Sequence, residues 1–295
     1  MENNQRKSRN YEMSTLMVID AANLNRRAHC GFGDCRNSDG FPVGAITGWI
    51  YSILRLREYK PDHMVAIFEG ARCPYRTSIC KEYKAHRSER PEDYELQIPA
   101  IKTLATYFGI HVIQPVEYEA DDLVAQIVND WVVDGNRATI ISSDKDFVPL
   151  LCDDVTIMKP ENGGKWSVVT VASATERYGV RPDQFQSWLA LNGDSADGFP
   201  GVYKVGPKTA TQLLQSHGSL EAIMGADLPG SLGALLKLDE TKALLDRNMK
   251  LVRFRAVTMD TQEATPGKLD LDAAMRELYR LKLGSLAGKV ARMID

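Results

Sequence analysis

Short apolar runs that end in acidic residues recur through the first half of this chain. The first run ends on Asp20 and the second on Glu69, while two later runs lead into Tyr118–Asp122 and Ser142–Asp146. Runs rich in Ile and Val that are bounded by turn residues are typical of buried β-strands. Because ligands of an open parallel sheet bind beyond the carboxyl ends of its strands, the pattern predicts acids gathered at one functional edge.

The stretches between the runs have the periodicity of helices. Apolar residues recur at three- and four-residue spacing over Val43–Leu54 and Leu123–Trp131, and a further helix is expected at about Leu96–Phe108. Strand, helix and strand in this order predict a parallel βαβ unit. A later strand at Val155–Met158 is followed by a returning strand at Trp166–Val169. The chain is therefore predicted to be α/β, with a mostly parallel central sheet and helices on both faces.

The acids at the predicted edge form a candidate metal site. Two carboxylates about 4 Å apart repel by roughly 4 kcal/mol at an effective dielectric of about 20, so converging acids need protonation or cations. All-oxygen ligands favour hard ions, which predicts Mg²⁺, with Mn²⁺ as a substitute, over Zn²⁺. Taken alone, the acids of Tyr118–Asp122 or of Ser142–Asp146 could instead form a helix N-cap and exposed turns. The candidate ligands are Asp20, Glu69, Glu119, Asp121, Asp122, Asp144, Asp146, Asp194 and Asp197.

The segment of residues 70–98 is basic and contains interleaved tyrosines. Its apolar residues are too few for a good core face, so it is either a solvated helix or a nucleic-acid clamp. We favour the clamp, because basic groups beside tyrosines suit phosphate contact and base stacking. Its position after a strand's carboxyl end places it over the proposed metals. The basic residues are Arg72, Arg76, Lys81, Lys84, Arg87 and Arg90.

The second half of the chain, from Ala172 onward, is predicted to be mostly helical. Gly201–Ala210 indicates a tight turn that feeds a new helix with Pro207 at its first position. The free N–H groups there, together with nearby lysines, would form a phosphate site. The alternative is an ordinary helix–turn–helix packing element. The candidate DNA-binding residues of this hairpin are Lys204, Gly206, Lys208 and Thr209. Later helices are expected at Ser219–Met224, about Gly233–Phe254 and Leu271–Leu283, with a loop at Thr258–Lys268.

Three regions are predicted along the chain. Residues 1–15 are expected to be a flexible tail, residues 16–178 an α/β core that includes the basic segment, and residues 179–295 a helical DNA-binding region with its hairpin at about 185–216. The formal charge of -3 argues only weakly against nucleic-acid binding, because the remainder is positive once the candidate ligands are set aside. Five cysteines without a CxxC pair fit a reduced, cytoplasmic protein, and no membrane-spanning segment is predicted.

In combination, these motifs resemble the 5′-nuclease domain of bacterial DNA polymerase I and the phage 5′–3′ exonucleases and flap endonucleases. The resemblance runs from about Met17 to about Phe254. Several spaced motifs in one order form a more specific signature than any one of them. The segments that carry the resemblance are Val18–Asp20, Ile67–Glu69, Tyr83–Arg87, Tyr118–Asp122, Ser143–Asp146, Gly193–Asp197 and Gly201–Ala210.

The resemblance implies a resolvase-like (PIN-like) nuclease core with a helical arch, a helix-hairpin-helix motif and a two-metal phosphodiesterase site. By motif position, one Mg²⁺ would lie among Asp20, Glu69, Glu119 and Asp121, and the other among or near Asp122, Asp144, Asp146, Asp194 and Asp197. The basic segment would be the arch. Lys84 and Arg87 would hold the scissile phosphate, Tyr83 would stack on a base, and Arg76 would make a second phosphate contact. The hairpin would grip duplex DNA, with a K⁺ ion bound.

Two positions depart from the family pattern. Glu69 stands where the family usually has Asp, and Lys204 stands where the hairpin usually has Gly, so a turn that needs positive φ would strain the lysine. The expected substrates are DNA with 5′ ends or 5′ flaps and duplex DNA, and the protein is expected to be a monomer. Activity on the RNA of RNA–DNA hybrids stays open. The alternatives are a PIN-like ribonuclease and a structure-specific DNA-binding protein with weak catalysis.

Overall fold

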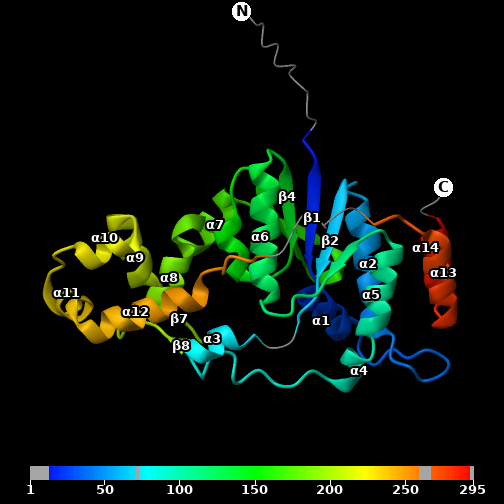
Figure 1. Cartoon of the computed structure of the whole chain (residues 1–295), viewed down its shortest axis with the longest axis horizontal. Helices are drawn as coiled ribbons and strands as arrows, with labels where there is room; N and C mark the ends of the chain where they lie inside the picture. Colours follow the sequence, from blue (N-terminus) through cyan, green and yellow to red (C-terminus); the bar gives the residue numbers. More distant parts are fainter. Residues whose placement is uncertain (1–12, 71–72, 259–266, 293–295) are drawn as a thin grey trace, which may run out of the picture.

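The computed structural model describes residues 13–70, 73–258 and 267–292, which form a central sheet with helices around it. The sheet has six strands in the order β3-β2-β1-β4-β5-β6 (Figure 1). Strands β1 to β5 are parallel and β6 pairs with β5 in the antiparallel sense, as the sequence predicts. The strands are β1 (Thr15–Asp20), β2 (His63–Ile67), β3 (His111–Ile113), β4 (Arg137–Ile141), β5 (Val155–Pro160) and β6 (Trp166–Val169).

Alternation along the first strand divides the core into two layers. Leu16 and Val18 pack on the face covered by α6 (Ala120–Val133), whereas Met17 and Ile19 pack on the opposite face. That opposite face is covered by α1 (Ala21–Phe32), α2 (Gly44–Arg57) and α5 (Ile98–Tyr107). Successive strand side chains point to opposite faces. Each fully buried Leu or Ile stabilises the fold by about 1.5–3 kcal/mol, so both layers hold β1 firmly.

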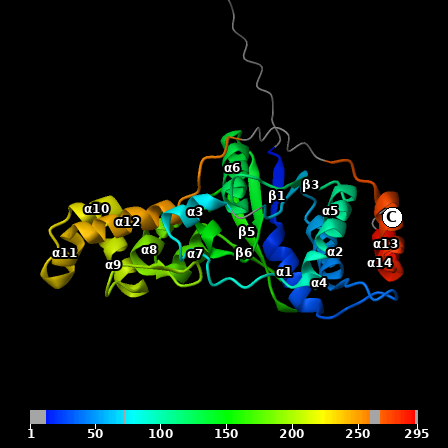
Figure 2. The ribbon, with the colours of Figure 1, turned by 60° about the horizontal axis from the view of Figure 1, so that its bottom comes forward.

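The helical half extends from the sheet to one side (Figures 1 and 2). It shares the core layer of α6, because Phe185, Leu189 and Leu214 join that cluster. The predicted helix at about Gly233–Phe254 is two helices, since Leu238 has extended dihedral angles. The elements are α7 (Val171–Tyr178), α8 (Phe185–Asn192), β7 (Gly193–Asp194), β8 (Phe199–Pro200), α9 (Pro207–His217), α10 (Leu220–Gly225), α11 (Gly230–Lys237) and α12 (Asp239–Val252).

The last two helices lie on the other side of the sheet. Helices α13 (Leu271–Arg280) and α14 (Gly284–Ala291) pack against α5 and α2, far from α8–α12 (Figure 1). Their apolar side chains, among them Leu278 and Leu286, complete the core layer of α2. The region predicted as helical at 179–295 thus includes two helices that pack on the opposite side of the sheet from α8–α12, because an amphipathic pattern does not specify which face a helix covers.

The basic segment of residues 70–98 runs along the carboxyl edge of the sheet (Figure 2). It contains the short helices α3 (Pro74–Ile79) and α4 (Glu92–Glu95), joined by turns and extended chain. Of the predicted tail, residues 1–12 lie outside the described residues, and Thr15 begins β1. Most of the loop predicted at Thr258–Lys268 also lies outside them. In the described part of the chain, no helix combines the length and apolarity needed to cross a membrane.

Candidate active site

Asp20 brings the first carboxylate to the carboxyl edge of the sheet. It ends β1 and caps α1, where its Oδ1 accepts the Asn23 N–H at 3.1 Å. The Ser142 hydroxyl, which follows β4, donates to Oδ2 at 2.8 Å. The carboxyl group is buried, and this burial raises the pKa of Asp20 to about 6. Asp20 can therefore cap α1 and also serve as a metal ligand.

The start of α6 supplies the next carboxylates. Glu119 is the N-cap residue of α6, and its Oε2 accepts Lys84 Nζ at 2.9 Å. Asp121 follows in the first turn. Burial raises the pKa of Asp121 well above its usual range, and repulsion from Asp20 and Asp144 adds to this, although Lys84 opposes it. These acids therefore share one electrostatic environment.

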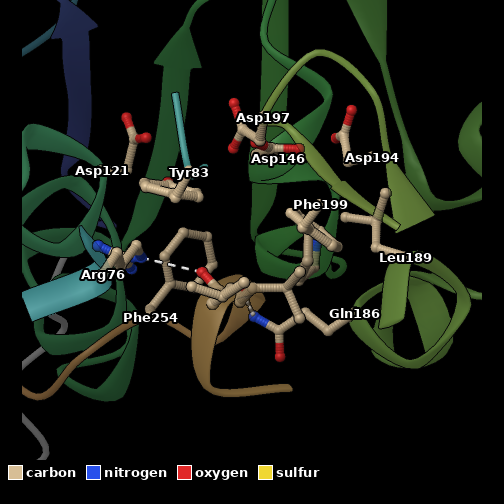
Figure 3. A pocket seen from close by; sticks show the side chains of 13 residues that line it. Arg76, Tyr83, Asp121, Asp146, Gln186, Leu189, Asp194, Asp197, Phe199 and Phe254 are labelled. Atoms are coloured by element: carbon tan, nitrogen blue, oxygen red, sulfur yellow. Dashed lines mark hydrogen bonds between the residues drawn. The ribbon is translucent and has the colours of Figure 1, made fainter. Parts of the chain in front are cut away.

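A second group of carboxylates surrounds Asp146. Asp144 caps the 3₁₀ turn after β4 by accepting the Asp146 N–H at 3.0 Å, while Asp194 ends β7 and Asp197 lies in the loop between β7 and β8. Burial raises the pKa of Asp146 to about 7, with added repulsion from Asp144 and Asp197. Figure 3 shows Asp146, Asp194 and Asp197 along one side of the same pocket as Asp121. Thus Asp144 adjoins both groups.

Basic side chains neutralise part of this charge. Lys84 pairs with Glu119, Arg87 Nη2 contacts Asp197 Oδ1 at 2.8 Å, and Lys145 pairs with Asp194. Burial alone would lower the pKa of Lys84, but Asp121, Glu119 and other neighbours raise it above its ordinary value, so Lys84 is a cation. Lys145 was not among the candidate residues predicted from the sequence. Its position between Asp144 and Asp146 in one tight turn could have indicated that it lies at the site.

The donor set fits a hard divalent cation. All the donors are carboxylate oxygens, and the buried Asp146 Oδ1 has no hydrogen-bond partner. A buried polar atom without a partner is costly unless something satisfies it. Within the described ranges, no three acidic, His or Cys side chains converge on one point. Cation binding would therefore require the side chains of these acids to move closer together.

Asp122 and Arg76 differ from their expected roles. Arg76 Nη1 and Nη2 donate to the two Asp122 oxygens at 3.0 and 2.6 Å, and both side chains are buried. The Arg255 N–H donates to Asp122 as well, at 2.9 Å. Asp122 is therefore enclosed within the protein, and Arg76, which also lies 3.4 Å from Glu119 Oε1, is only 3% exposed and so is buried away from a phosphate. We infer a structural role for both residues.

Glu69 and Tyr83 also differ from expectation. Glu69 follows β2, but its side chain is 44% exposed and pairs with Arg90, which in turn contacts Glu95. Glu69 is not among the main causes of the raised pKa of Asp121 or of Asp146. The Tyr83 ring is only 4% exposed and packs with Cys80, Phe199 and Leu251, so no face of it is open to a base. Lys81 is exposed, and Arg72 lies outside the described residues.

The predicted hairpin joins α8 to α9. Lys204 has φ +61, so the turn does need the left-handed conformation and the lysine is strained. Gly206 is the N-cap of α9 and Pro207 its first residue, which leaves the N–H groups of Lys208 and Thr209 without partners inside the helix. Lys204 and Lys208 are exposed. The hairpin thus presents backbone donors and positive charge together.

Comparison with known families identifies this arrangement. The model of the 5′-3′ exonuclease N-terminal resolvase-like domain matches residues 15–179, and that of the 5′-3′ exonuclease C-terminal SAM fold matches residues 180–272. The chain belongs to the 5′-3′ exonuclease family. It is therefore a nuclease, a hydrolase that acts on phosphodiester bonds of DNA.

Relatives of this exonuclease occur both alone and within longer proteins. It is 32% identical over 213 residues to a 5′-3′ exonuclease of Aquifex aeolicus, covering 72% of this chain and 73% of the relative. It is 34% identical over 209 residues to the thermostable DNA polymerase I of Thermus aquaticus, covering 71% of this chain. The match spans only 25% of that polymerase, so the similarity assigns no polymerase activity to this chain.

Solved structures share the fold of the exonuclease. T5 5′-exonuclease, solved with divalent zinc ions, matches with a TM-score of 0.66 and 21% identity, covering 95% of this chain and 100% of that one. The catalytic core of Rad2 in complex with a DNA substrate matches with a TM-score of 0.62 and 17% identity, covering 95% and 93%. At these identities the likeness supports the α/β core with its helical extension.

Proposed function

We propose that this exonuclease cleaves DNA at 5′ ends and 5′ flaps with two Mg²⁺ ions, for which Mn²⁺ can substitute. The observation that carries the proposal is the pair of adjoining carboxylate groups at the sheet edge, with Asp144 beside both and Asp146 Oδ1 unpartnered. Two ions at such a site activate water and stabilise the leaving oxygen. The bound divalent metals of T5 5′-exonuclease support a metal site here.

The proposed ligand sets follow the two groups. Asp20, Glu119 and Asp121 would hold one ion and Asp146, Asp194 and Asp197 the other, with Asp144 available to both. Glu69 and Asp122 leave the proposed set, because Glu69 faces Arg90 and Asp122 is enclosed by Arg76. The Ser142 hydroxyl would keep Asp20 oriented toward its ion.

Lys84 and Arg87 are proposed to hold the scissile phosphate. Both come from the segment along the sheet edge, and both form ion pairs with acids of the site, Lys84 with Glu119 and Arg87 with Asp197. Because the pKa of Lys84 is raised, it acts as a fixed positive charge and not as a proton donor. A cation aimed at developing negative charge stabilises the transition state. Exposed Lys81 would contact the 5′ strand outside the site.

The hairpin is proposed to hold duplex DNA. Lys204, Lys208 and the N–H groups of Gly206 and Thr209 would contact backbone phosphates, since a helix N-terminus favours anions. A K⁺ ion at the turn is part of the proposal, supported by the left-handed conformation retained at Lys204. The Rad2 catalytic core, which was solved in complex with a DNA substrate, supports the proposal that this chain binds DNA. We also propose that the protein acts as a monomer in the cytoplasm.

One assay tests the proposal. A 5′-flap duplex, a blunt duplex and a hybrid with a 5′ RNA strand are incubated with Mg²⁺, Mn²⁺, Zn²⁺ or EDTA, and the products are sized on a gel. We expect cleavage of both DNA substrates with Mg²⁺ and Mn²⁺, and none with EDTA. Cleavage confined to the RNA strand would instead support a PIN-like ribonuclease, and tight flap binding without cleavage would support a DNA-binding module.

A further inference from the structure

The turn that carries Lys84 rests on a loop from the helical half. We call residues 80–87 the arch turn and residues 194–201 the seat loop. The backbone N–H of Lys84 donates to the Asp197 carbonyl at 2.8 Å, and Arg87 donates to the Asp197 carboxylate at 2.8 Å. The two segments are more than a hundred residues apart in sequence, so these contacts join the two halves of the molecule at the active site.

Apolar packing holds the same two segments together. Cys80 and Tyr83 of the arch turn form a buried cluster with Phe199 of the seat loop and Leu251 of α12. All four side chains are 5% exposed or less. Figure 3 shows the Tyr83 ring at the edge of the pocket, between Asp121 and the acids of the seat loop. The ring therefore fills the space under the arch turn.

Gly198 makes this close approach feasible. Its φ is +79, and a Cβ added there would lie 2.6 Å from the Glu82 carbonyl oxygen and 3.3 Å from His86 Nδ1. Real Cβ atoms do not approach a backbone oxygen so closely, so any side chain at this position must push the arch turn away. A glycine is required here for both conformation and space.

The backbone of Lys84 is itself unusual. Its φ is +54, in the left-handed region that residues with a side chain rarely occupy. Such a conformation persists where surrounding contacts hold it, and it clusters at functional sites. Here the holding contact is the Lys84 N–H bond to Asp197. In this conformation Lys84 Nζ reaches Glu119 Oε2 at 2.9 Å, beside the acids of the site.

We propose that the seat loop is a positioning element for catalysis, in which Gly198 and the Asp197 carbonyl fix the backbone of Lys84 so that its ammonium group faces the reacting phosphate. The proposal rests on the phosphate role given to Lys84 above. Gly198 has no side chain that could contact the substrate or a metal ion, so its effect on catalysis passes through the arch turn. Displacing a catalytic group by about 1 Å can lower a rate by about a hundredfold.

The test compares two glycine substitutions. Gly198→Ala introduces the clash with Glu82, whereas Gly135→Ala places the same side chain at φ +83 with nothing within 4 Å, in the turn between α6 and β4 at the opposite edge of the sheet. We expect Gly198→Ala to lower single-turnover cleavage at saturating DNA by about tenfold to a hundredfold and to leave the Kd for DNA within about twofold. Gly135→Ala should match the parent in both.

Limited trypsin digestion supplies a readout independent of activity. The arch turn carries Lys81, Lys84 and Arg87 as cleavage sites. Gly198→Ala should be cut there faster than the parent and Gly135→Ala at the parental rate. Cys80→Ala removes a buried contact from the arch side, together with the thiol's bond to exposed Glu82, and changes none of the proposed metal ligands, so it should shift digestion and turnover in the same direction. Parental rates and digestion in both Gly198→Ala and Cys80→Ala would overturn the proposal.

A double-mutant cycle shows whether Gly198 acts through Lys84. If it does, Gly198→Ala should slow cleavage in the parent but have little further effect when Lys84 is already Ala. Additive effects, or an altered Mg²⁺ requirement in Gly198→Ala, would place its action on the Asp197 carboxylate and overturn the proposal. Parental turnover in Lys84→Ala alone would instead refute the phosphate role of Lys84, while the trypsin result still reports whether the seat loop holds the arch turn.

Discussion

Arg76 and Asp122 form a buried ion pair in which two guanidinium nitrogens meet both carboxylate oxygens. The distances are 3.0 and 2.6 Å, and the two residues are 3% and 0% exposed. Arg76 also donates to the carbonyl oxygens of Leu251 and Arg253 at the end of α12. The pair thus ties α3, α6 and α12 together at the base of the active site.

The first prediction concerns this pair. Arg76→Ala should lower the free energy of unfolding by about 3–5 kcal/mol, because it leaves the buried Asp122 charge without its cationic partner. Urea denaturation measures the loss. Arg55→Ala, which breaks the exposed pair with Glu58, is the control and should cost less than about 1 kcal/mol. A stable Arg76→Ala protein with weakened DNA binding would restore the phosphate contact expected from the sequence.

The second prediction separates ligands from structural acids. Asp144→Asn and Asp121→Asn should keep the fold and lower single-turnover cleavage by about a hundredfold or more, since a metal supplies several kcal/mol of transition-state stabilisation. Glu69→Gln should cleave within about threefold of the parent, because this exposed side chain faces Arg90. Near-parental cleavage by Asp144→Asn would refute the two-metal assignment, and a large loss in Glu69→Gln would return Glu69 to the ligand set.

The third prediction is a pH dependence of stability in EDTA. The pKa of Asp20 is raised to about 6 and that of Asp146 to about 7, mainly by burial. A carboxyl group whose pKa is higher in the folded chain stabilises the fold at low pH, and this contribution is lost as the pH rises through the folded-state value. The Tm in EDTA should therefore fall between about pH 4 and 7, from the ordinary Asp pKa up to the folded-state values, with the slope smaller in Asp146→Asn. A Tm that rises over this range would contradict the burial of these acids.

The fourth prediction concerns Lys204. Lys204→Gly should stabilise the protein by up to about 1 kcal/mol, because removing the left-handed strain of about 1–2 kcal/mol outweighs the entropy cost of glycine. Lys60→Gly, at φ +52 in the turn after α2, is the matched control for strain. Only Lys204→Gly should also lower the salt dependence of duplex binding. Equal salt dependence in both variants would leave Lys204 without a DNA contact.

The fifth prediction tests the start of α9. Lys208→Ala should weaken duplex binding equally across sequences and lower the slope of log K against log salt by roughly 0.9, as expected for one lost phosphate contact. Salt titration of binding in Ca²⁺ measures the slope. Single-turnover cleavage at saturating DNA should survive, since Lys208 is exposed at the start of α9 and is not one of the proposed metal ligands or scissile-phosphate contacts. An unchanged slope would remove the hairpin from the DNA interface.

The mostly parallel strands and the edge where the acids gather were predictable, because apolar runs and their final residues follow directly from the sequence. The role of Asp122 was not. Its spacing from Glu119 is that of a shared helix face, but in a capping turn the side chain returns toward the N-cap, and Arg76 then encloses it. Motif position cannot distinguish an acid that binds metal from a neighbouring acid that anchors an arginine.

Tyr83 shows a second limit. An aromatic residue among basic residues suggests stacking on a base, and the local sequence contains too few apolar residues to bury it. The residues that bury it, Phe199 and Leu251, come from the distant helical half. The strain at Lys204, in contrast, was predictable from the family resemblance, because Lys204 stands where the hairpin usually has Gly, and its φ is indeed +61.

The packing of α13 and α14 has a consequence for how the protein is made. Leu278, Leu286 and Val290 complete the layer that covers α2 and α5, yet they are among the last described residues of the chain. The ribosome therefore releases β1 and its Asp20 long before that layer is closed. Until α14 has emerged, the part of α2 that α14 covers stays in contact with water or with a chaperone. The polypeptide thus completes this core layer only after α14 has been synthesised.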